Sequence, residues 1–172
     1  MIVDVTKYLE LCEKHAEEII NDGISLKNFR NRNQNNLEKI KKQIRIGKLG
    51  EFGVYELLNT SYPDLSITSS KSYSADLFAG EKRLHVKTCA ESMRSWIFQV
   101  EDPLTYDPHP LDFIVLCYYK EAQNKIFIEI KQILKATLAV ELNLFKEPFV
   151  DKLKGIKKAI YLDDILSLKY FK

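Results

Sequence analysis

The stretch SADLFAGEKRLHVKTC, residues 74–89, contains an acid, an imidazole and an ammonium close together. Alternating apolar residues on each side of the turn at 80–82 predict two antiparallel strands. Alternation puts His85 and Lys87 on one face of the second strand, with Asp76 across from them. Such a set suits either a divalent cation beside a phosphoryl group or a surface ion pair between Asp76 and Lys87.

A second carboxylate belongs to the preceding helix. Residues 37–58 place apolar side chains at three- and four-residue steps, which predicts a long helix ending near Asn59, where the proline-containing segment that follows would break it. Glu51 is the one charge in this stripe, so we expect it to point toward the sheet, where a carboxylate needs a partner or a metal. Three glycines around it would let the helix approach the sheet or a ligand closely: Gly47, Gly50 and Gly53.

The remaining pattern predicts an amphipathic helix over residues 5–20, a polar loop at 28–36, then several strands. The predicted strands are 65–69, 75–79, 83–88, 95–100, 112–119 and 125–130, with helical or mixed sequence at 131–145 and a strand or short helix at the end. This order predicts an α/β or α+β fold with a central mixed sheet flanked by helices. A chain of 172 residues is long enough for a single domain with a real core.

Positive charge is concentrated in residues 27–48, which hold eight Lys or Arg against the single acid Glu38. Such a run is usually a solvated helix face. Here it leads directly to Glu51, which suits a polyanion whose phosphates must reach that carboxylate. The residues expected to contact nucleic acid are Arg30, Arg32, Lys41, Lys42, Arg45 and Lys48.

Glu51 within GKLGE on a helix, Asp76 on a strand, and Lys87 two residues after His85 together resemble the motif of the PD-(D/E)xK nuclease superfamily. The resemblance covers roughly residues 44–119 and includes the strands SWIFQ and DFIVL, which would continue the sheet. It implies the restriction-endonuclease-like fold, in which a central mixed sheet is flanked by helices. It also implies hydrolysis of DNA phosphodiester bonds with Mg²⁺, or Mn²⁺ as a substitute.

Carried over by position, the resemblance makes Asp76 the primary metal ligand and Glu51 a direct or indirect one. Val86 would offer its backbone carbonyl to the metal, and Lys87 would orient the attacking water and stabilise charge on the phosphate. His85 stands where the family has Asp or Glu, so it becomes a tentative metal ligand and catalytic residue at a site with one carboxylate fewer. Gln99, in the next strand, is a further candidate that faces either core or cleft.

The expected function is therefore a metal-dependent endonuclease acting on duplex DNA, similar to a type II restriction or phage nuclease, in which two copies would cut both strands. Residues 1–35 would form an N-terminal helix and basic loop, 36–130 the nuclease core, and 131–172 the C-terminal helical or mixed part. Two alternatives remain: a catalytically altered DNA-binding or assembly subunit of the same fold, and a small interaction protein with charges decorating a hairpin.

Other classes of protein are disfavoured. Three widely spaced cysteines argue against a disulfide framework, and the charged start of the chain does not resemble a signal peptide, so a cytoplasmic protein without a membrane partner is expected. Zinc is disfavoured because His85 and Cys89 lie about 13 Å apart along a strand. Cys12 and Cys117 are expected in the core, and His15 and His109 at the surface or in loops.

Overall fold

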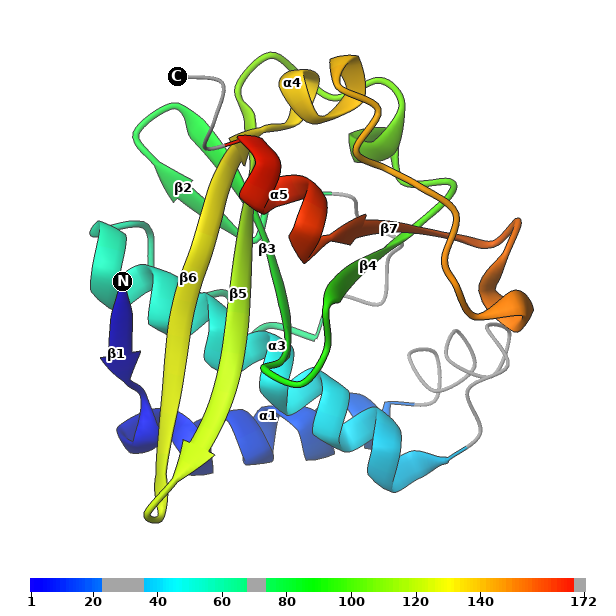
Figure 1. Ribbon diagram of the computed structural model, residues 1–172. Coiled ribbons are helices and arrows are strands. Elements are labelled where there is room, and N and C mark those ends of the chain that lie inside the picture. The colour runs from blue at the N-terminus through cyan, green and yellow to red at the C-terminus, as the bar shows by residue number, and fades with distance from the viewer. Residues whose placement is uncertain (23–35, 68–73, 169–172) are drawn as a thin grey trace.

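A curled, five-stranded mixed sheet with helices on both sides forms the centre of the computed structural model, which describes residues 1–22, 36–67 and 74–168 (Figure 1). The strand order is β1-β6-β5-β3-β2, and only the β3–β5 pair is parallel. The strands are β1 (Ile2–Asp4), β2 (Leu77–Ala79), β3 (Lys82–Ala90), β5 (Asp112–Ala122) and β6 (Lys125–Lys135). The expectation of a mixed α/β fold with a flanked central sheet is confirmed at this level.

Two helices, α1 (Leu9–Asn21) and α3 (Leu37–Leu58), cover one face of the sheet (Figure 1). The predicted helix 37–58 is confirmed residue for residue. Its end has a local cause, because Asn59 adopts the left-handed conformation at φ 51° that commonly terminates helices. The start of the first helix was predicted too early, since residues 2–4 form the edge strand β1 and a 3₁₀ turn, η1 (Thr6–Tyr8), precedes α1.

The opposite face carries a separate two-stranded antiparallel sheet of β4 (Ser95–Gln99) and β7 (Lys157–Tyr161). The expectation that SWIFQ continues the main sheet is therefore wrong. Trp96 and Phe98 point into the core under the main sheet instead, and the Trp96 Nε1 donates to the Cys117 carbonyl at 2.9 Å. This face also holds α4 (Ala136–Glu141), α5 (Leu162–Leu168) and the 3₁₀ turn η2 (Pro103–Thr105), and a further 3₁₀ turn, η3 (Asp151–Leu153), precedes β7.

Strand β5 explains the long apolar run FIVLCYY, because both of its faces are buried. Alternate residues pack toward α1 and α3: Val115, Cys117 and Tyr119. The intervening residues pack toward β4, β7 and α4: Ile114, Leu116 and Tyr118. The sheet is thus the partition between two apolar cores, and the expected core positions of Cys12 and Cys117 are confirmed.

Some of the other local predictions are confirmed and some are wrong. The hairpin at residues 75–88 is present as β2 and β3 with Gly80 at φ +60° in the turn. No strand forms at 65–67, and 68–69 lie outside the described residues. The mixed sequence after residue 130 divides into the end of β6, then α4, and the final segment is both strand and helix, β7 and α5. In the described part of the chain, no helix is long and apolar enough to cross a membrane.

Candidate active site

The helix α3 lies very close to the sheet where Glu51 is located, and two glycines make that approach possible. A Cβ on Gly50 would lie 1.8 Å from the Thr88 Oγ1, and one on Gly53 would lie 2.5 Å from Ile128 side-chain atoms. The close approach expected of the helical glycines therefore holds for these two, while Gly47 has open space around it. Glu51 is consequently held near β3, with its side chain only 12% exposed.

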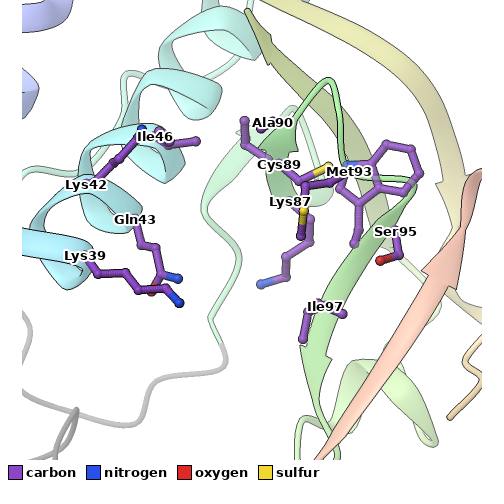
Figure 2. Close-up of a pocket in the computed structure, with 12 residues that line it drawn as sticks. Lys39, Lys42, Gln43, Ile46, Lys87, Cys89, Ala90, Met93, Ser95 and Ile97 are labelled. Carbon is purple, nitrogen blue, oxygen red and sulfur yellow. The ribbon is translucent and has the colours of Figure 1, made fainter. Parts of the chain in front are cut away.

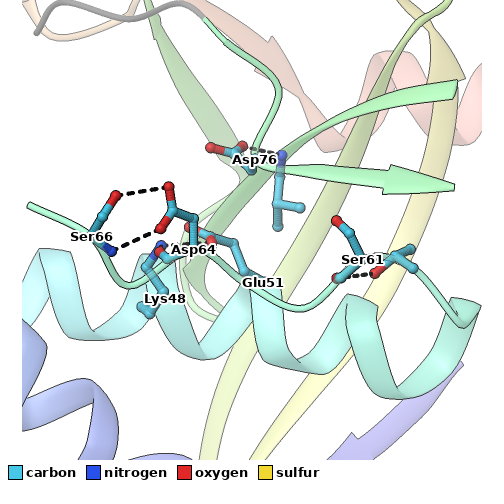
Figure 3. Close-up of polar contacts among 8 residues, drawn as sticks. Lys48, Glu51, Ser61, Asp64, Ser66 and Asp76 are labelled. Carbon is cyan, nitrogen blue, oxygen red and sulfur yellow. Dashed lines mark hydrogen bonds and ion pairs between the residues drawn. The ribbon is translucent and has the colours of Figure 1, made fainter. Parts of the chain in front are cut away.

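Glu51 already has one cationic partner within α3. The Lys48 Nζ donates to the Glu51 Oε2 at 2.7 Å and also to the Asp64 carbonyl at 2.7 Å, so it ties the helix to the segment that follows it. Figure 3 shows Lys48, Glu51 and Asp64 gathered above α3, with Asp76 on the β2 side of the group. The Asp64 carboxylate is engaged by the Ser66 N–H and hydroxyl, at 2.8 and 2.9 Å, and does not add a free acid to the group.

Asp76 lies immediately before β2, and its side chain supplies an acceptor to β3 where the backbone pairing of the two strands ends. Its N–H donates to the Leu84 carbonyl at 2.9 Å, which extends the backbone pairing of β2 with β3 by one residue. Beyond that point its Oδ2 accepts from the Val86 N–H at 2.7 Å, as a continuing strand would have done (Figure 3). Because the N–H and C=O of a strand residue point to the same side, the Val86 carbonyl also faces this open edge of β3.

The two carboxylates influence each other electrostatically. Burial raises the pKa of Glu51 to about 8, and the negative charge of Asp76 adds to that rise, while Lys48 and Lys87 oppose it. Asp76, Lys48 and Lys87 are therefore all within electrostatic reach of Glu51, although the four residues come from α3, the segment before β2, and β3. A cation bound beside such a carboxyl group would stabilise its ionised form and displace the proton that it otherwise keeps near neutral pH.

Lys87 projects from β3 between α3 and β4. Its Nζ lies 5.7 Å from the centre of the Phe98 ring, a cation–π contact. Within the described residues, no ion pair ties Lys87 to a particular carboxylate. Its ammonium is thus available to an anion that enters beside Glu51 and Asp76.

His85 belongs to a different group. Its ring is buried, and its Nε2 lies 3.0 Å from the Asp112 Oδ1, which also forms an ion pair with the Arg83 Nε at 3.1 Å. The structure describes no hydrogen bond or ion pair from His85 to Asp76 or Glu51. The prediction that His85 shares their site therefore gains no support from its contacts, because the acid at the start of β5 holds the ring elsewhere.

The residues predicted to contact nucleic acid differ in how free their charges are. Lys41 pairs with Glu17 at 2.6 Å and Arg45 with Glu13 at 2.8 Å, which joins α3 to α1. These two cations and Lys48 are partly neutralised, whereas Lys42 is exposed and has no ion pair with any residue that the structure describes. Arg30 and Arg32 lie outside the described residues.

The other sequence candidates lie away from this group. Gln99 is half-buried on β4, where it pairs with Lys157 of β7. His109 is an exposed loop residue, as expected, but the surface position expected for His15 is wrong, because α1 buries it. Two residues that sequence reasoning missed are Lys48 as the partner of Glu51 and Asp112 as the partner of His85. The i,i+3 spacing to Glu51 was a signal for the first of them.

No cluster of three or more His, Cys, Asp or Glu side chains able to hold a metal ion occurs among the residues described. A metal at this edge would thus rest on Glu51, Asp76 and backbone or solvent oxygens. Comparisons of the chain with protein-family models, curated proteins and solved structures find no match. Any functional assignment must therefore come from the chemistry of the group itself.

Proposed function

We propose that this protein is a Mg²⁺-dependent endonuclease that hydrolyses DNA phosphodiester bonds, on a restriction-endonuclease-like fold. The observation that carries the proposal is that Asp76, bound to the Val86 N–H at the edge of β3, and Lys87 both act electrostatically on the buried carboxylate of Glu51. The order of these residues along the chain is that of the PD-(D/E)xK motif. Three residues from separate elements thus supply an acid pair and an ammonium at one position.

The available donors fit Mg²⁺, with Mn²⁺ as a substitute. Mg²⁺ is commonly bound by one or two carboxylates, with water and substrate phosphates completing its shell. Glu51 and Asp76 provide the carboxylates, and the Val86 carbonyl faces the same edge. The ion would supply positive charge that polarises a phosphoryl oxygen and offsets the repulsion between the two acids.

The chain's own residues would divide the remaining work. Asp76 is fixed by the Val86 N–H through Oδ2, which leaves Oδ1 for the ion. Lys48 fixes Glu51 through Oε2. Lys87, held over the Phe98 ring, would orient the attacking water and neutralise charge that develops on the phosphate. Lys42, whose charge is free of ion pairs with described residues, would attract the backbone of the nucleic acid.

A second candidate is a catalytically altered DNA-binding or assembly subunit of the same fold. The observation that favours it concerns His85, which replaces the family's acid and is bound to Asp112. The group then has two carboxylates where the family motif has three. The two candidates differ in one measurable property, which is metal-dependent cleavage.

The test is incubation of supercoiled plasmid and of single-stranded DNA with the protein in Mg²⁺, Mn²⁺ or EDTA. We expect metal-dependent cleavage that is lost in Asp76→Asn and falls on the order of 10³-fold in Lys87→Ala. Matched controls are Glu141→Gln and Lys135→Ala, two exposed positions away from the group, which should cleave as the unaltered protein does. Conversion to linear product in one step would indicate two copies acting together.

Each outcome separates the candidates. DNA binding in EDTA without cleavage in either metal selects the altered subunit. Cleavage that is retained in both Asp76→Asn and Lys87→Ala contradicts the assignment of Asp76 and Lys87. Absence of both binding and cleavage removes nucleic acid as the substrate class.

A further inference from the structure

A pocket of about 440 Å³ lies beside the candidate active site, between α3 and the strands β3 and β4 (Figure 2). Lys87 lines this pocket as well as being within electrostatic reach of Glu51. In Figure 2, Lys39 and Gln43 of α3 extend toward Lys87 across the opening. The pocket therefore shares Lys87 with the candidate active site.

Three lysines contribute the positive charge of the pocket. Lys39 and Lys42 come from successive turns of α3, and Lys87 comes from the opposite wall. Neither Lys39 nor Lys42 forms an ion pair with a residue in the described ranges, in contrast to Lys41 and Arg45 on the same helix. Of the lysines and arginines of α3, those that line the pocket thus have no acidic partner among the described residues.

The walls of the pocket are largely apolar. Met93 and Ile97 lie on the side of β4, and Trp96 borders the pocket although its ring is buried in the core beneath β5. Met93 is 49% exposed, although a large apolar side chain gains by burial. A methionine sulfur and an aliphatic surface pack well against the flat face of an aromatic ring. A nucleotide suits this arrangement, because its phosphate would lie among the ammonium groups at the opening and its base against the apolar wall.

We propose that this pocket receives one unpaired nucleotide of the substrate, next to the phosphate held at Lys87. The inference rests on the proposed nuclease function and narrows its substrate to DNA that is single-stranded or locally unpaired. The volume lies within the roughly 300–1,000 Å³ of small-ligand pockets. A base in a duplex is stacked and paired, so it can enter only after it leaves the helix, which costs energy that an unpaired strand does not spend.

Trp96 gives a direct test because it is the only tryptophan in the chain. The protein is titrated in EDTA, so that no cleavage occurs, with a short oligothymidylate, a blunt duplex of the same length, and thymidine monophosphate. Tryptophan emission reports pocket entry, and the anisotropy of a labelled oligonucleotide reports total binding. We expect the single strand to bind about tenfold more tightly than the duplex and to change the emission. The mononucleotide should give the same change at far higher concentration.

Two variants locate the binding. Lys39→Gln combined with Lys42→Gln should weaken single-strand binding and lower the slope of log affinity against log salt by about 1.4, the value for two phosphates on a single strand. Ile97→Glu places a negative charge in the wall and should abolish the emission change for strand and mononucleotide alike. The matched control is Lys14→Gln with Lys135→Gln, two exposed lysines outside the pocket, for which affinity should be unchanged.

Equal affinity for duplex and single strand overturns the inference. So does an unaltered affinity in the Lys39/Lys42 and Ile97 variants. If metal-dependent cleavage persists in these cases, the proposed function stands and only the pocket assignment fails. If the mononucleotide gives the emission change but no oligonucleotide binds, the pocket serves a free nucleotide and the nucleic-acid inference is wrong.

Discussion

Strand β3 borders two groups with buried acids that differ in how completely those acids are satisfied. At its start, Asp112 is hydrogen-bonded to the His85 ring at 3.0 Å, accepts from the His109 N–H at 2.9 Å and forms an ion pair with the Arg83 guanidinium at 3.1 Å. Further along lie Glu51 and Asp76. Burial raises the pKa of Glu51 to about 8, and repulsion from the Asp76 carboxylate adds to that rise. One group surrounds a single carboxylate with donors, while in the other Lys48 and Lys87 offset only part of the effect of burial and of repulsion between two carboxylates.

The difference separates a structural acid from a functional one. A buried carboxylate with a full set of donors stabilises the arrangement around it and has no capacity for another ligand. A carboxylate pair that is short of donors costs stability, and a protein retains such a cost where a cation or substrate compensates it. We therefore interpret Asp112 as part of the scaffold that aligns β3 with β5, and Glu51 with Asp76 as the place for an ion.

The largest expected effect concerns the scaffold group. Asp112→Ala removes the acceptor for His85 and Arg83 and should lower the free energy of unfolding by about 3–5 kcal/mol. Asp76→Ala loses one hydrogen bond but also relieves repulsion on Glu51, so its cost should be within about 1 kcal/mol. Urea unfolding of both variants at pH 7 measures the contrast. Equal losses would show that Asp76 is as structural as Asp112.

The next effect is a pH-dependent gain from Glu51→Gln. The folded-state pKa of Glu51 is raised from 4.5 to about 8, so the folded protein binds the proton more tightly than the unfolded chain does. Ionisation therefore destabilises the fold progressively as pH rises from about 4.5 to 8, and the cost is complete above that range. Glutamine carries no such cost, so the variant's advantage should grow across this window to the order of a few kcal/mol.

Thermal unfolding between pH 5 and 9 measures the stability difference between Glu51→Gln and the unaltered protein. Glu141→Gln is the exposed control, which should show no such difference. Added Mg²⁺ or Mn²⁺ should stabilise the unaltered protein and reduce its difference from the variant, because an ion replaces the proton on Glu51. Chelation with EDTA should restore the difference. An advantage that is independent of pH would remove the argument from charge repulsion.

A smaller effect tests the close approach of α3 to the site. Gly50→Ala would set its Cβ 1.8 Å from the Thr88 Oγ1 and 2.9 Å from the Thr88 Cβ, so helix and strand must separate, at a cost of about 1–3 kcal/mol. Gly47→Ala is the matched control, because nothing lies within 4 Å of its added carbon. That variant should gain about 0.5–1 kcal/mol from its lower unfolded-state entropy. Urea midpoints that move in the same direction for both would contradict the packing argument.

These tests also show where sequence patterns were sufficient. The helix 37–58 and the buried strand at 112–119 follow from local periodicity, and the structure confirms both. The inward position of Glu51 followed from the same pattern, because Glu51 belongs to the apolar stripe of the helix and that stripe packs on the sheet. Local patterning therefore fixed which side chains face the sheet.

What local patterns could not show were partners distant in the chain. Strand β4 has the alternation of any half-buried strand, and its pairing with β7 depends on residues about sixty positions later. His85 shares its strand face with Lys87, yet Asp112, distant in sequence, determines where its ring lies. Side-chain parity gives a face of a sheet, but the competing acid on that face is visible only after the strands are assembled.

The smallest expected effect on catalysis comes from His85, and it decides whether the two groups are separate. His85→Gln keeps a donor that can reach Asp112, so unfolding should be easier by only about 1 kcal/mol. If the ring serves the scaffold alone, the cleavage rate, its dependence on pH and the preference between Mg²⁺ and Mn²⁺ should remain those of the unaltered protein. His85→Glu is the matching probe, because it would set a second carboxylate against Asp112 and lower stability without improving Mg²⁺ binding. Cleavage measured from pH 5.5 to 9 in each metal distinguishes the cases. A His85→Glu variant that binds Mg²⁺ more tightly would instead join His85 to the site of Glu51 and Asp76.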